Sequence, residues 1–123
     1  MPEKLRVLVV EDELLLSMML EDMLDELGVH VAGVATGNAE ALAAIRGVEC
    51  NCVLLDMHLN GERGDPIAEE LKSRAIPFAI LSGGPDTSAD LGAVTFVPKP
   101  YKFAEIERAV AELERELAEL GEG

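Results

Sequence analysis

Apolar residues recur along the chain in two alternating patterns. Five short runs of aliphatic and β-branched residues have the length of buried strands. Between them, apolar residues repeat every three or four positions, as they do on one face of a helix. The predicted strands are Leu5–Val10, Val29–Ala35, Val53–Leu55, Pro77–Leu81 and Val94–Val97. The predicted helices are Leu14–Leu27, Ala39–Arg46, Asp65 to about Arg74, Pro85–Gly92 and Phe103–Leu120.

This alternation predicts an α/β fold over residues 1–123 as one domain. We expect a doubly wound, five-stranded parallel sheet with right-handed crossovers and strand order 2-1-3-4-5, the flavodoxin-like (βα)5 arrangement. Helix-end residues fit the pattern, because Asn38 and Asp65 are suitable caps and Gly28 a suitable stop. The order 2-1-3-4-5 brings the carboxyl ends of strands one and three together, where open α/β sheets bind ligands.

Acidic side chains follow both of those strands. The third strand runs directly into Asp56, and the first into Glu11, Asp12 and Glu13. A buried, unpaired carboxylate costs several kcal/mol, so Asp56 is not explained by packing. Acids also favour helix N-termini, which accounts for part of the group after the first strand. Mutual repulsion of three neighbouring acids points instead to a bound divalent cation, and both explanations stay open on these residues alone.

The fourth and fifth strands end in other polar groups. Ser82 is followed by Gly83, which offers a hydroxyl and accessible N–H groups to an anion, although a simple Ser/Gly turn explains the same residues. Lys99 lies between Pro98 and Pro100, and the Lys99–Pro100 bond is a candidate cis peptide. The topology collects Ser82 and Lys99 on the same rim as Asp56.

Composition narrows the choice of partners. The 123 residues are 49% hydrophobic and carry a formal net charge of −14, which disfavours nucleic acid and anionic lipid as ligands. No apolar stretch approaches the roughly 20 residues of a membrane span, and the start leaves no room for a signal peptide, so we expect a cytoplasmic protein. Cys50 and Cys52 are expected to be reduced and to share one strand face.

Taken together, four motifs resemble the receiver domain of bacterial two-component response regulators. They are Val9-Val10-Glu11-Asp12, Leu54-Leu55-Asp56, Leu81-Ser82-Gly83 and Val97-Pro98-Lys99-Pro100. The resemblance covers the whole chain and implies Mg²⁺-dependent (or Mn²⁺-dependent) transfer of a phosphoryl group to Asp56, from a histidine kinase or a phosphotransfer protein. Such a domain is a self-phosphorylating acceptor with autophosphatase activity only, not an enzyme acting on other substrates.

The resemblance also assigns roles within the site. It implies that Glu11, Asp12, Asp56 and the backbone carbonyl of His58 hold the metal. Lys99 and Ser82 would bind the phosphoryl oxygens, helped by the N–H of Gly83, and Phe96 would stand where the family has a switch aromatic on the fifth strand. The alternative for Phe96 is an ordinary core residue.

The implied output is a protein–protein contact. The resemblance implies an output face on the fourth helix, fifth strand and last helix, with a downstream protein effector. The last helix is long, so we expect a monomer or a weak dimer through it. Two alternatives within this class are a phosphate sink or relay, and an unphosphorylated pseudo-receiver that acts only as a binding module.

Two other classes fit less well. A Mg²⁺-dependent aspartyl phosphatase needs an acid two residues beyond its nucleophile, where this chain has His58. A flavodoxin needs a phosphate-binding loop after the first strand, where Glu11-Asp12-Glu13 would repel phosphate.

Overall fold

The computed structural model describes residues 4–47, 49–59, 61–82 and 92–122. One sheet contains five parallel strands in the order β2-β1-β3-β6-β7. These strands are β1 (Arg6–Val10), β2 (His30–Ala35), β3 (Cys52–Asp56), β6 (Phe78–Ser82) and β7 (Thr95–Pro98). The helices are α1 (Leu14–Glu26), α2 (Asn38–Arg46), α3 (Asp65–Ser73) and α4 (Phe103–Glu122). In chain order the sheet is 2-1-3-4-5, as predicted.

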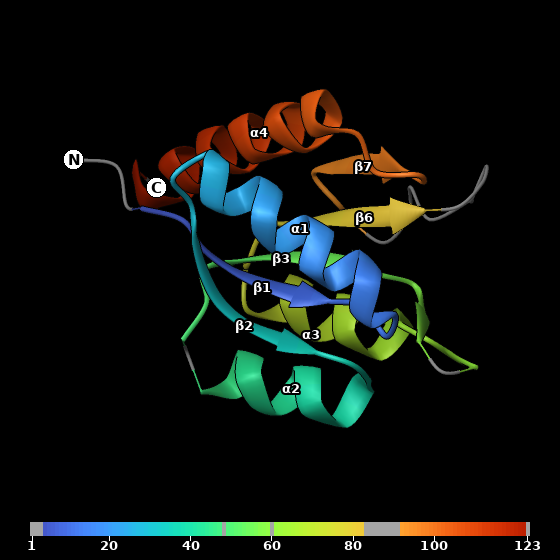
Figure 1. Ribbon diagram of the computed structural model, residues 1–123. Helices are drawn as coiled ribbons and strands as arrows, with labels where there is room; N and C mark the ends of the chain where they lie inside the picture. The colour runs from blue at the N-terminus through green and yellow to red at the C-terminus, as the bar shows by residue number, and fades with distance from the viewer. Residues whose placement is uncertain (1–3, 48, 60, 83–91, 123) are drawn as a thin grey trace.

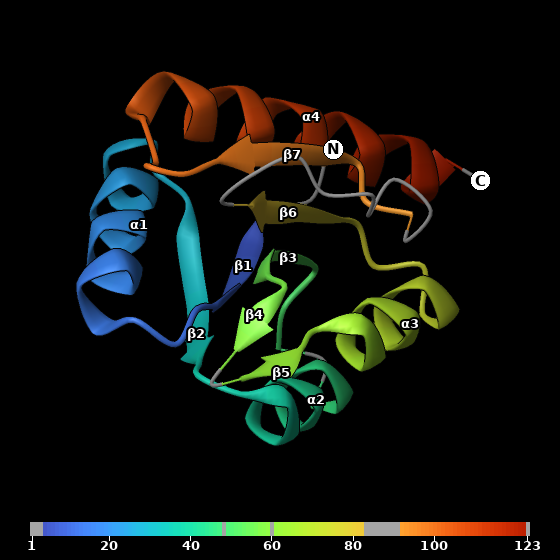
Figure 2. The same ribbon diagram turned by 90° about the vertical axis from the view of Figure 1, so that its right-hand side faces the viewer.

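Helices cover both faces of the sheet. Helices α1 and α4 lie on one face and α2 and α3 on the other (Figures 1 and 2). Successive strand residues alternate between the two cores: Leu54 packs with α1 and α4, whereas Val53 and Leu55 pack with α2 and α3. Because β3 is buried on both faces, its sequence is a continuous apolar run rather than an alternating one.

Several predicted local features are confirmed. The stripe of α1 points inward, with Leu20 and Leu24 fully buried. Gly28 adopts φ +73 just after that helix, a left-handed conformation that glycine accepts without strain. The Lys99–Pro100 peptide is cis. The predicted helix Pro85–Gly92 falls almost entirely on residues 83–91, which lie outside the described part of the chain.

Both predicted helix caps are wrong. The residue before each helix is a glycine, Gly37 for α2 and Gly64 for α3, and neither helix has a side-chain cap. Asn38 instead donates from its amide to the Arg63 carbonyl at 3.1 Å. Asp65 accepts from the Arg63 side chain at 2.7 Å. Asn38 and Asp65 are the first residues of their helices rather than caps, and both side chains bond to Arg63.

The predicted loop after Asp56 contains a small hairpin. Strands β4 (His58–Leu59) and β5 (Glu62–Arg63) pair in antiparallel fashion, and Leu59 is buried. Gly64 closes this hairpin against β3, since a Cβ on Gly64 would lie 3.2 Å from the Asp56 carbonyl oxygen. A larger residue there would push on the backbone of Asp56 itself.

The two cysteines do not share a strand face. Cys52 belongs to the core beneath α1 and α4, whereas Cys50 belongs to the core beneath α2 and α3. The strand begins only at Cys52, so strand alternation does not extend back to Cys50. Both thiols are buried and free, and burial raises the pKa of Cys52 to about 12, so it stays protonated and unreactive.

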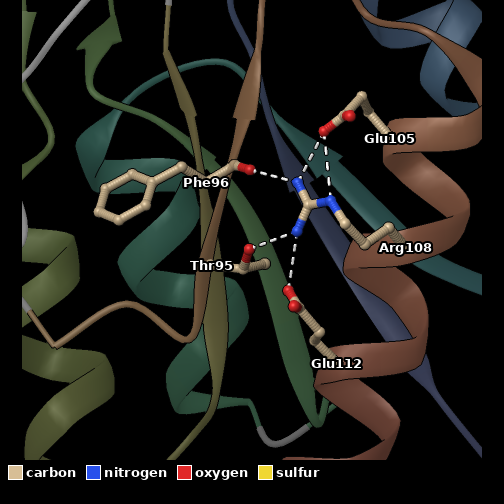
Figure 3. A network of polar contacts seen from close by, with 5 residues as sticks. All are labelled: Thr95, Phe96, Glu105, Arg108 and Glu112. Atoms are coloured by element: carbon tan, nitrogen blue, oxygen red, sulfur yellow. Dashed lines mark hydrogen bonds and ion pairs between the residues drawn. The ribbon is translucent and has the colours of Figure 1, made fainter.

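A polar network joins the edge strand β7 to α4 (Figure 3). The Arg108 guanidinium donates to the Thr95 hydroxyl at 2.6 Å and to the Phe96 carbonyl at 2.7 Å. Glu105 and Glu112 flank the same guanidinium at 2.8 and 2.9 Å. The Phe96 ring points away from Arg108 and is 38% exposed, so Phe96 is not a core residue.

Candidate functional site

Three carboxylates meet at the carboxyl end of the sheet. Because β1 and β3 are parallel neighbours in register, with Val10 beside Leu55, the residues that follow both strands emerge together. Glu11, Asp12 and Asp56 each offer an oxygen, and these oxygens lie within 4.8 Å of one another. The structure therefore brings together the three side chains that the sequence predicted as metal ligands.

Asp56 is held by two donors. Its Oδ2 accepts from Lys99 Nζ at 3.0 Å, and its Oδ1 accepts from the backbone N–H of His58 at 3.0 Å. The Asp56 side chain is 2% exposed. Donors to both oxygens keep this buried carboxylate in one orientation at the carboxyl end of β3.

Lys99 balances more than one acid. Its ammonium also lies 3.8 Å from Glu11 Oε1. Partial burial alone would lower the pKa of Lys99, but the hydrogen bond to Asp56 and the charges of Asp56 and Glu11 raise it overall. Lys99 therefore stays charged at neutral pH, and it reaches the site across β6, from the end of β7.

The oxygens of this cluster suit a hard divalent cation. Carboxylate oxygens are the ligands that Mg²⁺ and Ca²⁺ prefer. The three carboxylates and the Lys99 ammonium together carry a net charge of −2 when all four groups are ionised. A divalent ion balances that charge, so the residues fit a metal on both donor chemistry and charge balance.

The surroundings of Glu11 disfavour its ionised form. Its side chain is fully buried, and burial raises the pKa of Glu11 from 4.5 to about 7; the bond with Asp56 and its charge act in the same direction, while Tyr101 and Lys99 oppose them. Without a cation, the ionised form of Glu11 is therefore costly in the folded state.

This predicts a pH-dependent stability for the metal-free protein. Below pH 4.5 Glu11 is protonated in both states, so the full stability is present. As pH rises from 4.5 to about 7, the folded state binds the proton more tightly than the unfolded state and stability falls, by up to about 3 kcal/mol. Urea unfolding with a chelator present, at pH 5 and pH 7.5, measures the loss. The Glu11→Gln variant should lose less over this window, and parallel curves would contradict the shift.

The structure describes only part of what was predicted for His58, Ser82 and Gly83. The His58 side chain is exposed, and its backbone N–H, rather than its imidazole, faces Asp56. Ser82 ends β6 beside Pro98 of β7, so its backbone is on the expected rim. The Ser82 side chain and Gly83 lie outside the described part of the chain. Their roles, like the carbonyl of His58 as a ligand, remain predictions.

Sequence reasoning missed one residue of the site. Tyr101 follows Pro100 and is buried, and its hydroxyl donates to Glu11 Oε1 at 2.6 Å. A tyrosine two positions beyond a lysine at a strand's carboxyl end was the available signal. It reads in sequence as an ordinary core aromatic.

Comparison with known proteins identifies relatives of this chain. A family model described as "Response regulator receiver domain" matches residues 7–111. The chain is 32% identical over 91% of its length to a "Probable transcriptional regulator ycf27" of Cyanophora paradoxa, and 31% identical over 85% to the "Transcriptional regulatory protein PdtaR" of Mycobacterium tuberculosis. It spans about half of these curated relatives, 49% and 54%.

Solved structures show the same fold. The solution structure of SdrG from Sphingomonas melonis Fr1 matches with a TM-score of 0.78 and 34% identity, over 89% of this chain and 96% of that one. The crystal structure of the response regulator PhyR from Brucella abortus matches with a TM-score of 0.84 and 27% identity, over 98% of this chain and 52% of that one.

Proposed function

Because the chain belongs to the response regulator receiver domains, a family of phosphoacceptor signalling modules, we propose that Asp56 is its phosphoacceptor. The observation that carries this proposal is the position of Asp56 between a cationic donor and two further acids, at the carboxyl end of the central strand. No other carboxylate of the described residues combines burial, a lysine at 3.0 Å and neighbouring oxygen ligands.

The proposed reaction is a simple displacement at phosphorus. A carboxylate oxygen of Asp56 forms the new P–O bond, the P–N bond of a phosphohistidine breaks, and its electron pair returns to the imidazole nitrogen. Phosphoryl transfer depends on positioning and charge neutralisation more than on proton transfer, so the site needs no general base. The exposed imidazole of His58 agrees with that.

Each residue has a separate task in this scheme. Glu11, Asp12 and Asp56 would hold Mg²⁺, or Mn²⁺, which when bound offsets the charge of the phosphoryl oxygens. Lys99 bonds Asp56 Oδ2 at 3.0 Å, so its ammonium would lie beside the added phosphoryl oxygens and bind them. The backbone N–H of His58 holds the other oxygen of Asp56 and orients the attacking group.

The proposed partners follow from the same chemistry. A histidine kinase or phosphotransfer protein would supply the phosphoryl group, and a downstream protein effector would read it. A net charge of −14 favours partner surfaces that are basic. Phosphorylation of Asp56 would change the contacts of Lys99, which follows β7. The Arg108 network connects β7 to α4.

A direct experiment tests the proposal. The protein is incubated with acetyl phosphate and Mg²⁺, and intact mass spectrometry follows the addition of one phosphoryl group. We expect a protein species that carries one phosphoryl group. Hydroxylamine should remove that group, because this nucleophile cleaves an acyl phosphate. An unmodified mass under conditions in which the protein binds Mg²⁺ would favour the binding-module alternative instead.

A further inference from the structure

Tyr101 contacts both Glu11 and Lys99 of the proposed site. It is the only tyrosine of the chain, which has no tryptophan, and it is 4% exposed. Its hydroxyl donates to Glu11 Oε1 at 2.6 Å. Its ring lies 5.8 Å from Lys99 Nζ, within reach of a cation–π contact. One side chain thus touches both a proposed metal ligand and the cation beside Asp56.

The hydroxyl is the donor in this bond. Burial, together with the bond to Glu11 and the nearby acids, raises the pKa of Tyr101 well above its usual value, so the phenol keeps its proton. A short O–H···O⁻ bond to a fully buried carboxylate is strong, because water does not compete for either group.

Glu11 also contacts Asp56, the backbone N–H of Glu13 and the Lys99 ammonium. Its other oxygen, Oε2, accepts the N–H of Glu13 at 3.3 Å, and Lys99 is 3.8 Å from Oε1. Glutamate has one more rotatable bond than aspartate, so a glutamate ligand loses more rotamer freedom when it is fixed toward a metal. The bond from the Tyr101 hydroxyl, at 2.6 Å, is shorter than the contacts of Glu11 with the Glu13 N–H and with Lys99.

We propose that Tyr101 is a positioning residue for divalent-cation binding, holding the Glu11 carboxylate toward Asp12 and Asp56. This inference rests on the proposed role of Glu11 as a metal ligand and assigns the residue that orients it. Hydrogen bonds to ligating groups commonly set metal affinity, since a ligand that must first be ordered binds more weakly.

The decisive variant is Tyr101→Phe, which removes one hydroxyl and keeps the ring under Lys99. We expect its Kd for Mg²⁺, measured by isothermal titration calorimetry, to rise by about tenfold or more. At saturating Mg²⁺ the labelling rate should return close to that of the wild type, because Tyr101 does not touch Asp56. Thr95→Val is the matched control: it also removes a hydroxyl 2.6 Å from a charged partner, Arg108, and should leave the Kd unchanged.

A second measurement uses the wild-type protein alone. As the chain's only tyrosine, Tyr101 gives the tyrosine absorbance and emission, and its bond to Glu11 makes both sensitive to that carboxylate. We expect Mg²⁺ to shift the absorbance and change the emission with the same Kd that calorimetry reports. This readout remains decisive even where Tyr101→Phe fails to fold.

Three outcomes would overturn the inference. Equal Mg²⁺ affinities of wild type and Tyr101→Phe, with phosphoryl labelling intact, would overturn this inference and leave the proposed function standing. A tyrosine spectrum unchanged by Mg²⁺ at concentrations that calorimetry shows to be saturating would do the same. A wild-type protein that takes up no Mg²⁺ would overturn both this inference and the metal ligands of the proposed function.

Discussion

Replacing Asp56 with asparagine is expected to reduce phosphoryl labelling by at least about 1,000-fold, to background. The amide keeps the size of the side chain, and its oxygen still accepts the His58 N–H or the Lys99 ammonium. It lacks the anionic oxygen that attacks phosphorus. Intact mass spectrometry after reaction with acetyl phosphate and Mg²⁺ measures the loss.

The control for this variant is Asp25→Asn, which makes the same chemical change on the exposed side of α1. It should be labelled as fast as the wild type. Circular dichroism of both variants checks that the fold is retained. A phosphoryl group retained in Asp56→Asn, and located by peptide mapping on another residue, would refute the assignment of Asp56.

Removing the divalent cation is expected to have the second largest effect. With a chelator present, an incoming phosphoryl group meets three carboxylates and the single positive charge of Lys99, so labelling should fall to background. The Asp12→Asn variant should weaken Mg²⁺ binding by about 10- to 100-fold, and so slow labelling at limiting Mg²⁺. The initial labelling rate as a function of Mg²⁺ concentration measures both effects.

Saturating Mg²⁺ should restore part of the Asp12→Asn rate, because the phosphoacceptor itself is intact. Glu21→Gln, a change of the same kind on α1 outside the cluster, should follow the wild-type curve. Labelling that proceeds equally well in the chelator would show that the acid cluster does not act through a metal.

Much of the fold was predictable because its signals are local. Strands and helices alternate clearly in apolar pattern, and parallel α/β sheets permit few strand orders. Once the order 2-1-3-4-5 is chosen, residues after strands one, three and five must share one rim. That is why the sequence predicts Glu11, Asp56 and Lys99 at one site, although they follow strands far apart in the chain.

The errors arise from where the helices and strands begin. Asn38 and Asp65 are suitable caps by residue type, but each is the first residue of its helix, and its side chain bonds to Arg63. Cys50 would follow strand alternation only if the strand extended back to it, and the strand begins at Cys52. In each case the outcome depended on the residue at which the helix or strand begins, which residue type alone does not determine.

The sequence by itself determined the alternation of elements, the parallel sheet and the acidic rim at its carboxyl end. These depend on side-chain type and spacing, which the chain carries locally. Only the tertiary structure decided that Tyr101 donates to Glu11 across 90 residues, that Lys99 contacts both Asp56 and Glu11, and that Arg108 joins α4 to β7. A polar side chain chooses among all donors and acceptors within reach, and that set exists only after the chain has folded.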